Sequence, residues 1–341
     1  MTTEDLSIVI VSDAWFPQVN GVVRTLDTCR QGLIARGHSV TMVTPDQFKT
    51  IPCPTYPEIR LALTLPGRVG RLIEAARPKN RPMAIHIATE GPLGQMARSH
   101  CLKHGHPFTT AYHTRFPEYI RPRFGIPLAW SYAVLRKFHR PSSSVMVATQ
   151  TIEDALAENG FANIRRWTRG VDTALFRPRP KDWLDLPRPI QVYVGRVAIE
   201  KNIEAFLRLK TPGTKMVVGD GPQMAELKRK YPDVHFAGVK TGEDLAAHYA
   251  AADLFVFPSR TDTFGLVLLE AMASGLPVAA YPVPGPLDVV NGSGAGVLDE
   301  DLGRAVEAAL KIPPQIARSY AETFSWDASL DQFLGNLHVF A

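Results

Sequence analysis

The sequence has few cysteines and lacks a long hydrophobic run. Its three cysteines (Cys29, Cys53 and Cys101) are too far apart for a paired zinc or redox motif, so reduced thiols in a cytoplasmic protein are expected. Glycines and prolines interrupt the longest uncharged stretch, residues 271–287, which therefore predicts no membrane-spanning helix. The N-terminus shows neither the basic nor the apolar segment of a signal peptide.

Acidic residues are scarce in the first half of the chain. Residues 1–170 carry a formal net charge of +9, whereas residues 171–341 carry −4. The excess of basic residues is concentrated in residues 60–140, which contain 14 basic and 3 acidic residues. This asymmetry indicates an acidic partner for the first half, and the alternative is simply a solvated basic surface.

Strand-like and helix-like segments alternate along the chain in two successive series. The length of 341 residues favours two domains. Short apolar runs recur with helix-length segments between them, which predicts α/β domains with doubly wound parallel sheets. A proline-rich stretch separates the two series. We expect an N-terminal domain over 1–170, a linker over 171–189, a second domain over 190–318, and a C-terminal helix over 319–341 that packs back on the first domain.

Ligands of open α/β sheets bind beyond the carboxyl ends of the strands, so the loops there are the candidates. Arg196 and Lys201, in VGRVAIEKN, precede a helix, where a bound phosphate would explain two cations. The alternative is a solvated pair of Lys201 with a nearby glutamate. Gly21 opens a helix after the first strand and suits an anion, or is an ordinary turn. Gly221, in VGDGP, is weaker evidence because many turns have this pattern.

Two carboxylates, Asp262 and Glu270, occur in the apolar segment SRTDTFGLVLLEAMASGLPV. Asp262 is expected in a loop after a strand, and residues 264–266 in the Phe-Gly-Leu start of a helix that carries Glu270. A carboxylate in apolar surroundings is costly unless it is hydrogen-bonded, and a sugar hydroxyl is the donor we expect. The alternative is that Glu270 caps neighbouring backbone.

Two residues of the first half, Glu90 and His113, also follow predicted strands. Their place at strand ends directs them to the same edge of the sheet, where a ligand would bind. A lone histidine is more often structural than catalytic, so both interpretations of His113 stay open.

Taken together, these residues resemble the retaining GT-B glycosyltransferases of family 4, in the branch of lipid-glycosylating, sulfolipid-synthase and mannosyltransferase-like enzymes. The likeness covers nearly the whole chain and is strongest in VGRVAIEKN, VGDGP, AAADLFVFPSRTDTFGLVLLEAMASGLPVAA and TRGVDTALFRP. This resemblance implies two Rossmann-like domains facing a cleft, residues 1–170 as the acceptor-side domain and residues 190–318 as the nucleotide-sugar donor domain. Asp262 stands where the family usually has the first Glu of a Glu-x7-Glu motif, and its shorter side chain is a departure. The proline-rich YPVPGPLDVVNGSGAG is another.

The resemblance also implies roles for individual residues. Those expected to be catalytic are His113, Asp262, Arg196 and Lys201. Those expected to bind the donor are Gly21, Glu90, Arg196, Lys201, Gly221, Lys240, Asp262, Thr263, Phe264, Gly265, Leu266 and Glu270. Arg196 and Lys201 would hold the diphosphate, with Glu270 on the nucleotide ribose and no metal or other cofactor required.

The implied reaction transfers a hexose or hexuronate from a nucleotide diphosphate sugar, UDP-sugar being favoured, to a lipid hydroxyl such as that of diacylglycerol. A GDP-mannose-dependent mannosyltransferase acting on a lipid or saccharide is the first alternative. Others are a GT-B nucleotide-sugar epimerase and a non-catalytic membrane-docking protein. Nucleic acid is not an expected partner, because the basic half has no recognised reading motif.

A basic segment with aromatic residues, IRPRFGIPLAWSYAVLRKFHRP, is the expected acceptor region. Such a helix suits the surface of an anionic membrane, so we expect peripheral attachment at the inner face of the membrane. The residues assigned to this contact are Arg121, Arg123, Trp130, Arg136, Lys137 and Arg140. The alternative is a helix packed inside the first domain with a polar outer face.

Overall fold

The computed structural model describes residues 5–18, 20–53, 56–78, 80–113, 117, 125–260, 262 and 264–341. The chain divides into two compact units. Unit 1 comprises Met1–Thr168 and Asp327–Ala341, and unit 2 comprises Arg169–Trp326. Among the described residues, no helix is both long and apolar enough to cross a bilayer.

Unit 1 is built on a sheet in the order β2-β1-β5-β6-β7-β8, all parallel, with β15 antiparallel to β5. Its strands are β1 (Ser7–Val11), β2 (Ser39–Val43), β5 (Met83–Ile87), β6 (Thr109–Ala111), β7 (Val145–Val147), β8 (Ile164–Arg166) and β15 (Val339–Phe340), beside a hairpin of β3 (Lys49–Cys53) and β4 (Tyr56–Leu63). Its helices are α1 (Gly21–Ala35), η1 (Pro45–Gln47), α2 (Pro66–Ala75), α3 (Pro92–His104), α5 (Leu128–His139), α6 (Gln150–Glu158) and α14 (Trp326–Asn336).

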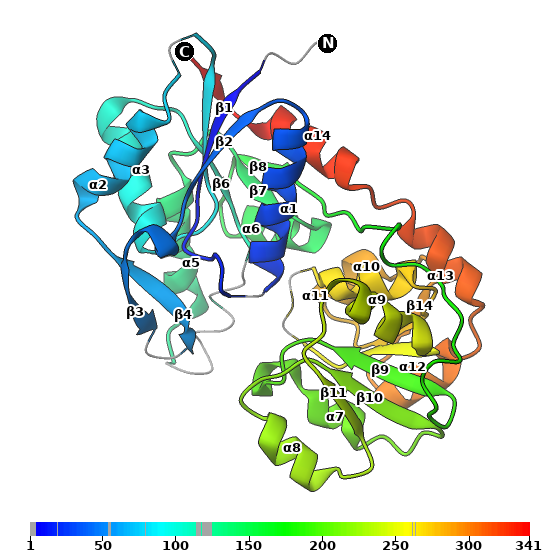
Figure 1. Ribbon diagram of the computed structural model, residues 1–341. Coiled ribbons are helices and arrows are strands. Elements are labelled where there is room, and N and C mark those ends of the chain that lie inside the picture. The colour runs from blue at the N-terminus through cyan, green and yellow to red at the C-terminus, as the bar shows by residue number, and fades with distance from the viewer. Residues whose placement is uncertain are drawn as a thin grey trace. The chain divides into compact units, whose positions relative to one another are not determined.

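Strand β1 is buried on both faces, as expected of a central parallel strand. Its alternate residues therefore point into two cores. Ile8 and Ile10 pack with Leu26 of α1 and Phe333 of α14, whereas Val9 and Val11 pack with residues of α2 and α3. Helices thus cover both faces of the sheet, which makes unit 1 a three-layer α/β structure (Figure 1).

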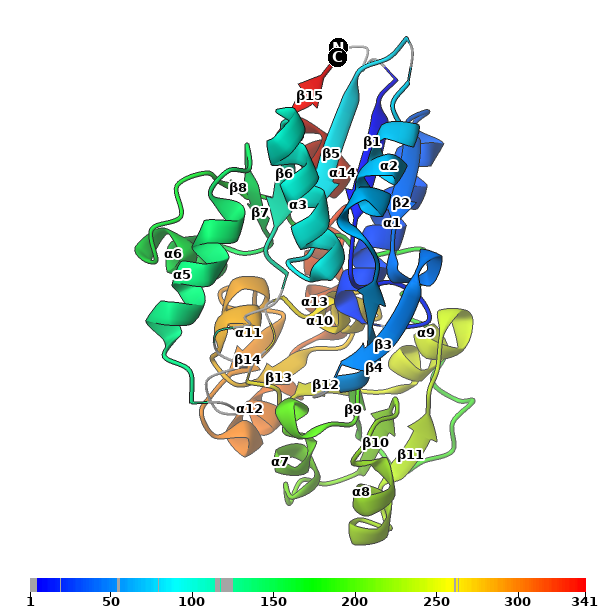
Figure 2. The same cartoon turned by 90° about the vertical axis from the view of Figure 1, so that its left-hand side faces the viewer.

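Unit 2 repeats this arrangement with an all-parallel sheet in the order β11-β10-β9-β12-β13-β14. Its strands are β9 (Ile190–Val194), β10 (Thr214–Val218), β11 (His235–Gly238), β12 (Leu254–Phe257), β13 (Val278–Ala280) and β14 (Gly296–Leu298). Its helices are η2 (Ile199–Lys201), α7 (Ile203–Leu207), α8 (Met224–Lys230), α9 (Gly242–Ala251), α10 (Leu266–Ala273), α11 (Pro284–Val289), α12 (Leu302–Ala309) and α13 (Pro314–Ala321). Figure 2 labels α7 to α13.

The stretch predicted as a linker, residues 171–189, belongs to unit 2. Asp253 explains why. Its carboxylate accepts hydrogen bonds from Lys181 Nζ at 2.9 Å, from Arg188 Nη2 at 2.7 Å and from the Ile190 backbone N–H at 2.8 Å. This proline-rich stretch is therefore held against the start of the sheet of unit 2. Its composition alone does not indicate that.

The C-terminal segment, predicted as one helix, forms two helices, and the boundary between the two units lies between them, at the start of the second helix. Helix α13 belongs to unit 2, where Arg318 donates to the carbonyl of Ala273 at 2.8 Å. Helix α14, apart from its first residue, belongs to unit 1, where Arg36 donates to Asp331 at 2.6 Å and to Asp327 at 2.9 Å. The predicted segment 319–341 thus begins too early, since packing on unit 1 starts at residue 327.

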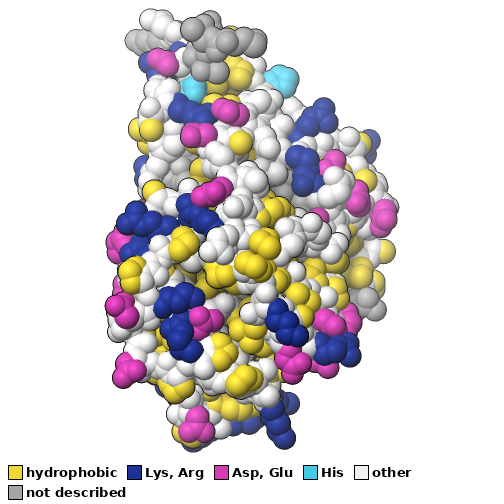
Figure 3. All heavy atoms as spheres, turned by 90° about the vertical axis from the view of Figure 1, so that its right-hand side faces the viewer, with side chains coloured by type: hydrophobic (Ala, Val, Ile, Leu, Met, Phe, Trp, Pro, Cys, Tyr) yellow, Lys and Arg dark blue, Asp and Glu magenta, His cyan; other side chains and the backbone are white. Residues whose placement is uncertain are grey.

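Charge is mixed on the described part of the face that Figure 3 shows, where basic and acidic side chains are interspersed. Such a surface is typical of a solvated protein face. The basic excess of the first half therefore has to be sought in particular elements of unit 1.

Candidate functional site

The strand order of unit 2 defines where a ligand would bind. Numbered along the chain, its strands lie in the order 3-2-1-4-5-6, so the direction of winding reverses between β9 and β12. Ligands of such sheets bind beyond the carboxyl ends of the strands at this switch point. The loop after β9 carries Arg196 and Lys201, and the loop after β12 carries Asp262. The fold thus brings Asp262 to Lys201, 61 positions earlier in the sequence.

Lys201 and Asp262 form an ion pair at this point, with Lys201 Nζ 2.5 Å from Asp262 Oδ1. About a fifth of each side chain is exposed. The second carboxylate oxygen, Asp262 Oδ2, is buried and has no hydrogen-bond partner within the described part of the chain. A buried acceptor without a donor is uncommon in folded proteins. It is the chemistry expected of an atom that accepts a hydrogen bond from a ligand hydroxyl.

Arg196 belongs to the same loop after β9 as Lys201. Its Nη1 is 3.6 Å from Glu200 Oε1, one helical turn ahead, and its carbonyl accepts a hydrogen bond of 2.9 Å from the hydroxyl of Tyr193. Burial, followed by the carboxylates of Asp262 and Glu200, raises the pKa of Tyr193 well above 10. Tyr193 therefore stays a neutral hydrogen-bond donor that fixes the backbone of Arg196, a role that its place inside a strand did not reveal.

The glycines of VGDGP allow two backbone segments to approach each other. Gly219 has φ +138°, and a Cβ placed there would lie 1.9 Å from the carbonyl oxygen of Gly195. A Cβ on Gly221 would lie 2.4 Å from the carbonyl oxygen of Val197. The Val197 N–H in turn donates to the carbonyl of Asp220 at 2.8 Å. The predicted donor residue Gly221 thus has a structural role in holding the Arg196 loop.

Helix α10 begins directly after the Asp262 loop. The N-cap residue, Gly265, is in the left-handed conformation (φ +81°) and has no side chain with which to cap the first turn from Leu266. Phe264 is buried below it. An uncapped first turn presents backbone N–H groups that favour an anion. Thr263, also predicted to bind the donor, lies outside the described residues.

The neighbouring helix α11 contains a glycine that the sequence analysis did not single out. A Cβ on Gly285 would lie 3.1 Å from the carbonyl oxygens of both Asp262 and Phe264. Gly285 thus lets α11 lie against the backbone of the Asp262 loop. The proline-rich segment around it, noted as a departure from the family pattern, is the signal that could have identified it.

Glu270 is buried in α10, as its apolar sequence suggested, but a side chain of the protein donates a hydrogen bond to its carboxylate. The hydroxyl of Tyr249 in α9 donates to Glu270 Oε2 at 3.0 Å. Tyr249 could not be predicted from the sequence, because it comes from a separate helix. A nucleotide contact by Glu270 stays a prediction.

Lys240, the last predicted donor residue of unit 2, follows β11 at the edge of the sheet. Its Nζ is 3.2 Å from Asp244 Oδ2, one turn ahead in α9. Because β10 separates β11 from β9, Lys240 is not in either loop that flanks the switch point.

Unit 1 has its own switch point, between β1 and β5. Asp13, after β1, joins the two loops there. Its carboxylate accepts hydrogen bonds from the Thr89 hydroxyl at 2.8 Å, the Leu93 N–H at 2.8 Å and the Gly94 N–H at 3.3 Å. Burial raises the pKa of Asp13, and these hydrogen bonds partly offset the effect. Asp13 is thus a buried cap of α3, which the sequence analysis did not predict.

Gly21 is the first residue of α1 and lies in the open, since a Cβ there would meet nothing within 4 Å. The side chain of Asn20 accepts hydrogen bonds from the N–H groups of Val22 and Val23, at 3.0 Å each. Two of the N–H groups expected to face an anion are therefore already capped. Space at Gly21 remains for a ligand.

Glu90 and His113 follow adjacent strands of unit 1, β5 and β6. Glu90 Oε1 contacts Nε2 of His139 at 3.2 Å, and His139 Nδ1 is 2.9 Å from the Thr110 hydroxyl. His139 is fully buried, so Glu90 is tied to helix α5. His113 is half-buried, and its ring packs edge-on against Trp167 with centroids 5.8 Å apart.

Helix α5 buries one face and exposes the other. Buried residues include Tyr132, Leu135 and Phe138, whereas Trp130 is 62% exposed. The outer face also presents Val134 together with the predicted membrane residues Arg136, Lys137 and Arg140. An exposed tryptophan beside basic residues is the composition of an interfacial helix. The other two residues of this prediction, Arg121 and Arg123, lie outside the described residues.

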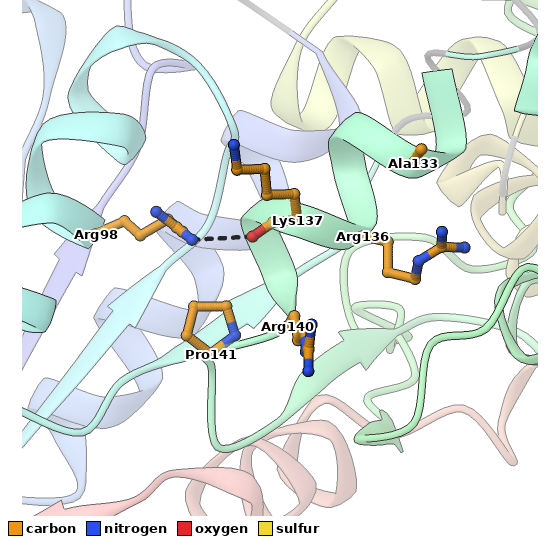
Figure 4. Close-up of a pocket in the computed structure, with 6 residues that line it drawn as sticks. All are labelled: Arg98, Ala133, Arg136, Lys137, Arg140 and Pro141. Atoms are coloured by element: carbon orange, nitrogen blue, oxygen red, sulfur yellow. Dashed lines mark hydrogen bonds between the residues drawn. The ribbon is translucent and has the colours of Figure 1, made fainter. Parts of the chain in front are cut away.

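A basic hollow of about 510 Å³ lies between α5 and α3. Figure 4 shows its lining: Arg98, Ala133, Arg136, Lys137, Arg140 and Pro141. Arg98 holds the end of α5, since its guanidinium donates to the carbonyls of Lys137 at 2.9 Å and Phe138 at 2.8 Å. Four cations around one hollow favour an anionic group.

Two family models match the chain. The model described as Glycosyltransferase Family 4 matches residues 19–175, and the model described as Glycosyl transferases group 1 matches residues 188–312. A GDP-mannose-dependent alpha-mannosyltransferase of Mycobacterium tuberculosis (strain CDC 1551) is 30% identical over 85% of this chain and 83% of its own length. An alpha-monoglucosyldiacylglycerol synthase of Streptococcus pneumoniae is 26% identical over 98% of this chain and 85% of its own.

The fold matches solved structures as well. Sucrose-phosphate synthase of Thermosynechococcus elongatus has a TM-score of 0.73 and 22% sequence identity to the chain, and the match covers 97% of this chain and 98% of that one. At this identity the match establishes a shared GT-B architecture of two parallel-sheet α/β domains.

Proposed function

Because the chain belongs to glycosyltransferase family 4, the family that its motifs predicted, we propose that it transfers a hexose or hexuronate from a nucleotide diphosphate sugar to a lipid hydroxyl, with retention of the anomeric configuration. The observation that carries this proposal is the Lys201–Asp262 pair at the switch point of unit 2, with its buried, unpartnered Asp262 Oδ2. It supplies a cation for the leaving diphosphate and an acceptor for a sugar hydroxyl at one place.

The leaving diphosphate gains negative charge as the glycosidic bond breaks. In the proposed reaction Arg196 and Lys201 stabilise that charge, and the uncapped first turn of α10 adds N–H groups from Leu266 onward. Donors fixed in place before the reaction contribute most when charge develops on the leaving group. Tyr193 holds the backbone of Arg196, and Asp262 holds the ammonium group of Lys201. A metal ion is not required for this stabilisation.

A lipid acceptor is supported by helix α5 and by one relative. The outer face of α5 combines exposed Trp130 with Arg136, Lys137 and Arg140, which suits an anionic bilayer surface. The Streptococcus pneumoniae relative is named for a glucosyldiacylglycerol product. We therefore propose diacylglycerol as the acceptor class and peripheral attachment at the inner face of a membrane as the working location.

UDP-sugar is the donor that we favour from the sequence, and GDP-mannose is the second candidate. The 30% identical relative is named for GDP-mannose, which supports the second. Both donors carry a diphosphate between nucleoside and sugar. The charged residues of unit 2 suit either one, and the difference has to come from contacts to the base and the sugar hydroxyls.

A panel assay tests the proposal. UDP-glucose, UDP-glucuronate, UDP-sulfoquinovose and GDP-mannose are each incubated with the protein, with anionic or neutral vesicles containing diacylglycerol or with a soluble saccharide, in EDTA. We expect a glycolipid from one donor, more of it with anionic vesicles. Transfer only to the soluble saccharide would overturn the proposal of a lipid acceptor. Dependence on added metal would overturn metal independence. Release of a free epimerised sugar nucleotide would overturn the proposed transfer reaction itself.

A further inference from the structure

A short histidine-rich segment of unit 1, HCLKHGH, takes no part in the site described above. His100 and His104 lie one turn apart on α3, with ring centroids 4.4 Å from each other. Gly105 then ends the helix in the left-handed conformation, at φ +68°. This cap turns the chain back, so that the His106 N–H donates to the carbonyl of Cys101 at 2.9 Å and the His106 ring returns to within 5.8 Å of the His100 ring.

A carboxylate from a second helix lies between two of these rings. Glu74 of α2 places Oε1 2.8 Å from Nε2 of His100 and 2.8 Å from Nε2 of His106. One ligand atom from each of the three residues lies within 4.8 Å of the others, the only such group found in the described part of the chain. Both histidine side chains are 13% exposed, so the cluster lies at the surface but is largely enclosed.

The surroundings hold the three side chains in this geometry. Gly70 of α2 leaves room for the His100 ring, because a Cβ there would lie 2.4 Å from His100 Nδ1. Phe340 of the C-terminal strand β15 stacks on His106, with centroids 5.4 Å apart. Burial raises the pKa of Glu74, but the hydrogen bonds from His100 and His106 outweigh it, so the pKa is lowered and the carboxylate is ionised at neutral pH.

We propose that Glu74, His100 and His106 form a zinc site, with Glu74 Oε1, the two Nε2 atoms and one solvent molecule as ligands. Two imidazoles and a carboxylate are a ligand set that Zn²⁺ accepts in a tetrahedral geometry. Bonds of 2.0–2.1 Å place tetrahedral ligands about 3.4 Å apart, so each 2.8 Å contact has to widen by about 0.6 Å. Small rotations of three surface side chains supply that distance.

Zinc here would join α2 to α3 and, through His106 and Phe340, to the C-terminal strand. The inference goes beyond the proposed transfer reaction, because the site lies in unit 1 and includes none of the donor residues of unit 2. Zn²⁺ would take the lone pair of each Nε2 atom, with the single proton of each neutral ring on Nδ1. Because protons compete with Zn²⁺ for these nitrogens, binding should weaken as the pH falls. Nearby Cys101 does not compete as a ligand, since burial raises the pKa of its thiol to about 12.

The test measures Zn²⁺ binding to the full-length protein by competition with a chromogenic chelator. His104→Gln is the matched control, because His104 belongs to the same segment but not to the ligand group. We expect one Zn²⁺ per chain, a loss of affinity of at least about tenfold in Glu74→Gln, His100→Gln and His106→Gln, and little change in His104→Gln. X-ray absorption should give Zn–N/O distances of about 2.0–2.1 Å with two imidazoles.

Melting temperatures in EDTA show whether each variant folds, and the three ligand variants are independent of one another, so one misfolded variant leaves the test intact. The wild-type melting temperature should rise with Zn²⁺, as binding to the native state requires. Absence of saturable binding would overturn the proposal. An equal loss in His104→Gln would overturn it too, because it would indicate non-specific attraction to a histidine-rich tract.

Discussion

Replacing Lys201 by alanine separates a role in catalysis from a role in structure. Lys201 faces Asp262 at 2.5 Å and, in the proposed reaction, also faces the donor diphosphate. If the lysine only neutralises Asp262, then removing both charges should restore the enzyme. If it stabilises the leaving diphosphate, the double variant Lys201→Ala/Asp262→Asn should be at least about 10²-fold slower than Asp262→Asn alone, which already includes the loss of the carboxylate.

The magnitudes make the two cases distinguishable. Exposed ion pairs contribute about 0.2–1 kcal/mol, and removal of one partner of a fully buried pair costs about 3–5 kcal/mol. With about a fifth of each side chain exposed, Lys201→Ala should cost roughly 1–3 kcal/mol of unfolding free energy. Loss of a donor to the leaving group should lower kcat by about 10²–10³-fold, or about 2.7–4 kcal/mol.

Steady-state transfer kinetics and urea unfolding of the same samples provide the readouts. Lys230→Ala is the control, since Lys230 pairs with Glu204 on the surface of the same unit. It should keep wild-type kcat. We expect the double variant to recover stability relative to Lys201→Ala and to remain at least about 10²-fold slower than Asp262→Asn. A double variant within about tenfold of Asp262→Asn would refute the reasoning, since that loss is well below the loss of one donor.

Three further predictions concern the surroundings of this pair. Arg196→Ala should lower kcat by about 10²–10³-fold with little change in melting temperature, and equal turnover in kinetic assays would exclude Arg196 from the reaction. Tyr249→Phe should cost about 1–3 kcal/mol in urea unfolding, because buried Glu270 loses a donor, and an unchanged midpoint would contradict this. Gly219→Ala should destabilise unit 2 more than Gly292→Ala does. Both glycines have positive φ, but only the Cβ added at Gly219 meets backbone, at 1.9 Å. Equal unfolding free energies of the two variants would argue against that close approach.

The fold followed from local patterns in most of the chain. Buried apolar runs such as Ser7–Val11 and Leu254–Phe257 are strands, and the family motifs indicated two parallel-sheet domains. Proline content, on which the linker prediction rests, says nothing of Asp253, which accepts hydrogen bonds from Lys181 and Arg188 of residues 171–189 across 65–72 positions of sequence. The division between α13 and α14 is likewise set by packing, which helical periodicity does not reveal.

The proximity of Lys201 and Asp262 could be predicted from the sequence, whereas their roles stay predictions. Each residue follows a strand, and parallel topology brings such positions together. The partners that hold such residues could not be predicted in the same way. Tyr193, Tyr249 and His139 are buried side chains whose hydrogen bonds depend on the packing of separate elements. Nothing in their local sequence distinguishes them from ordinary core residues.

The product itself tests the central claim most directly. The protein is incubated with a donor of known α configuration and with diacylglycerol in anionic vesicles, and the anomeric configuration of the purified glycolipid is determined from its NMR coupling constants. The account predicts that the wild-type protein forms an α-linked glycolipid. It also predicts that the Arg196→Ala variant forms this product at least about 10²-fold more slowly. A β-linked product, or undiminished formation by the variant, would contradict it.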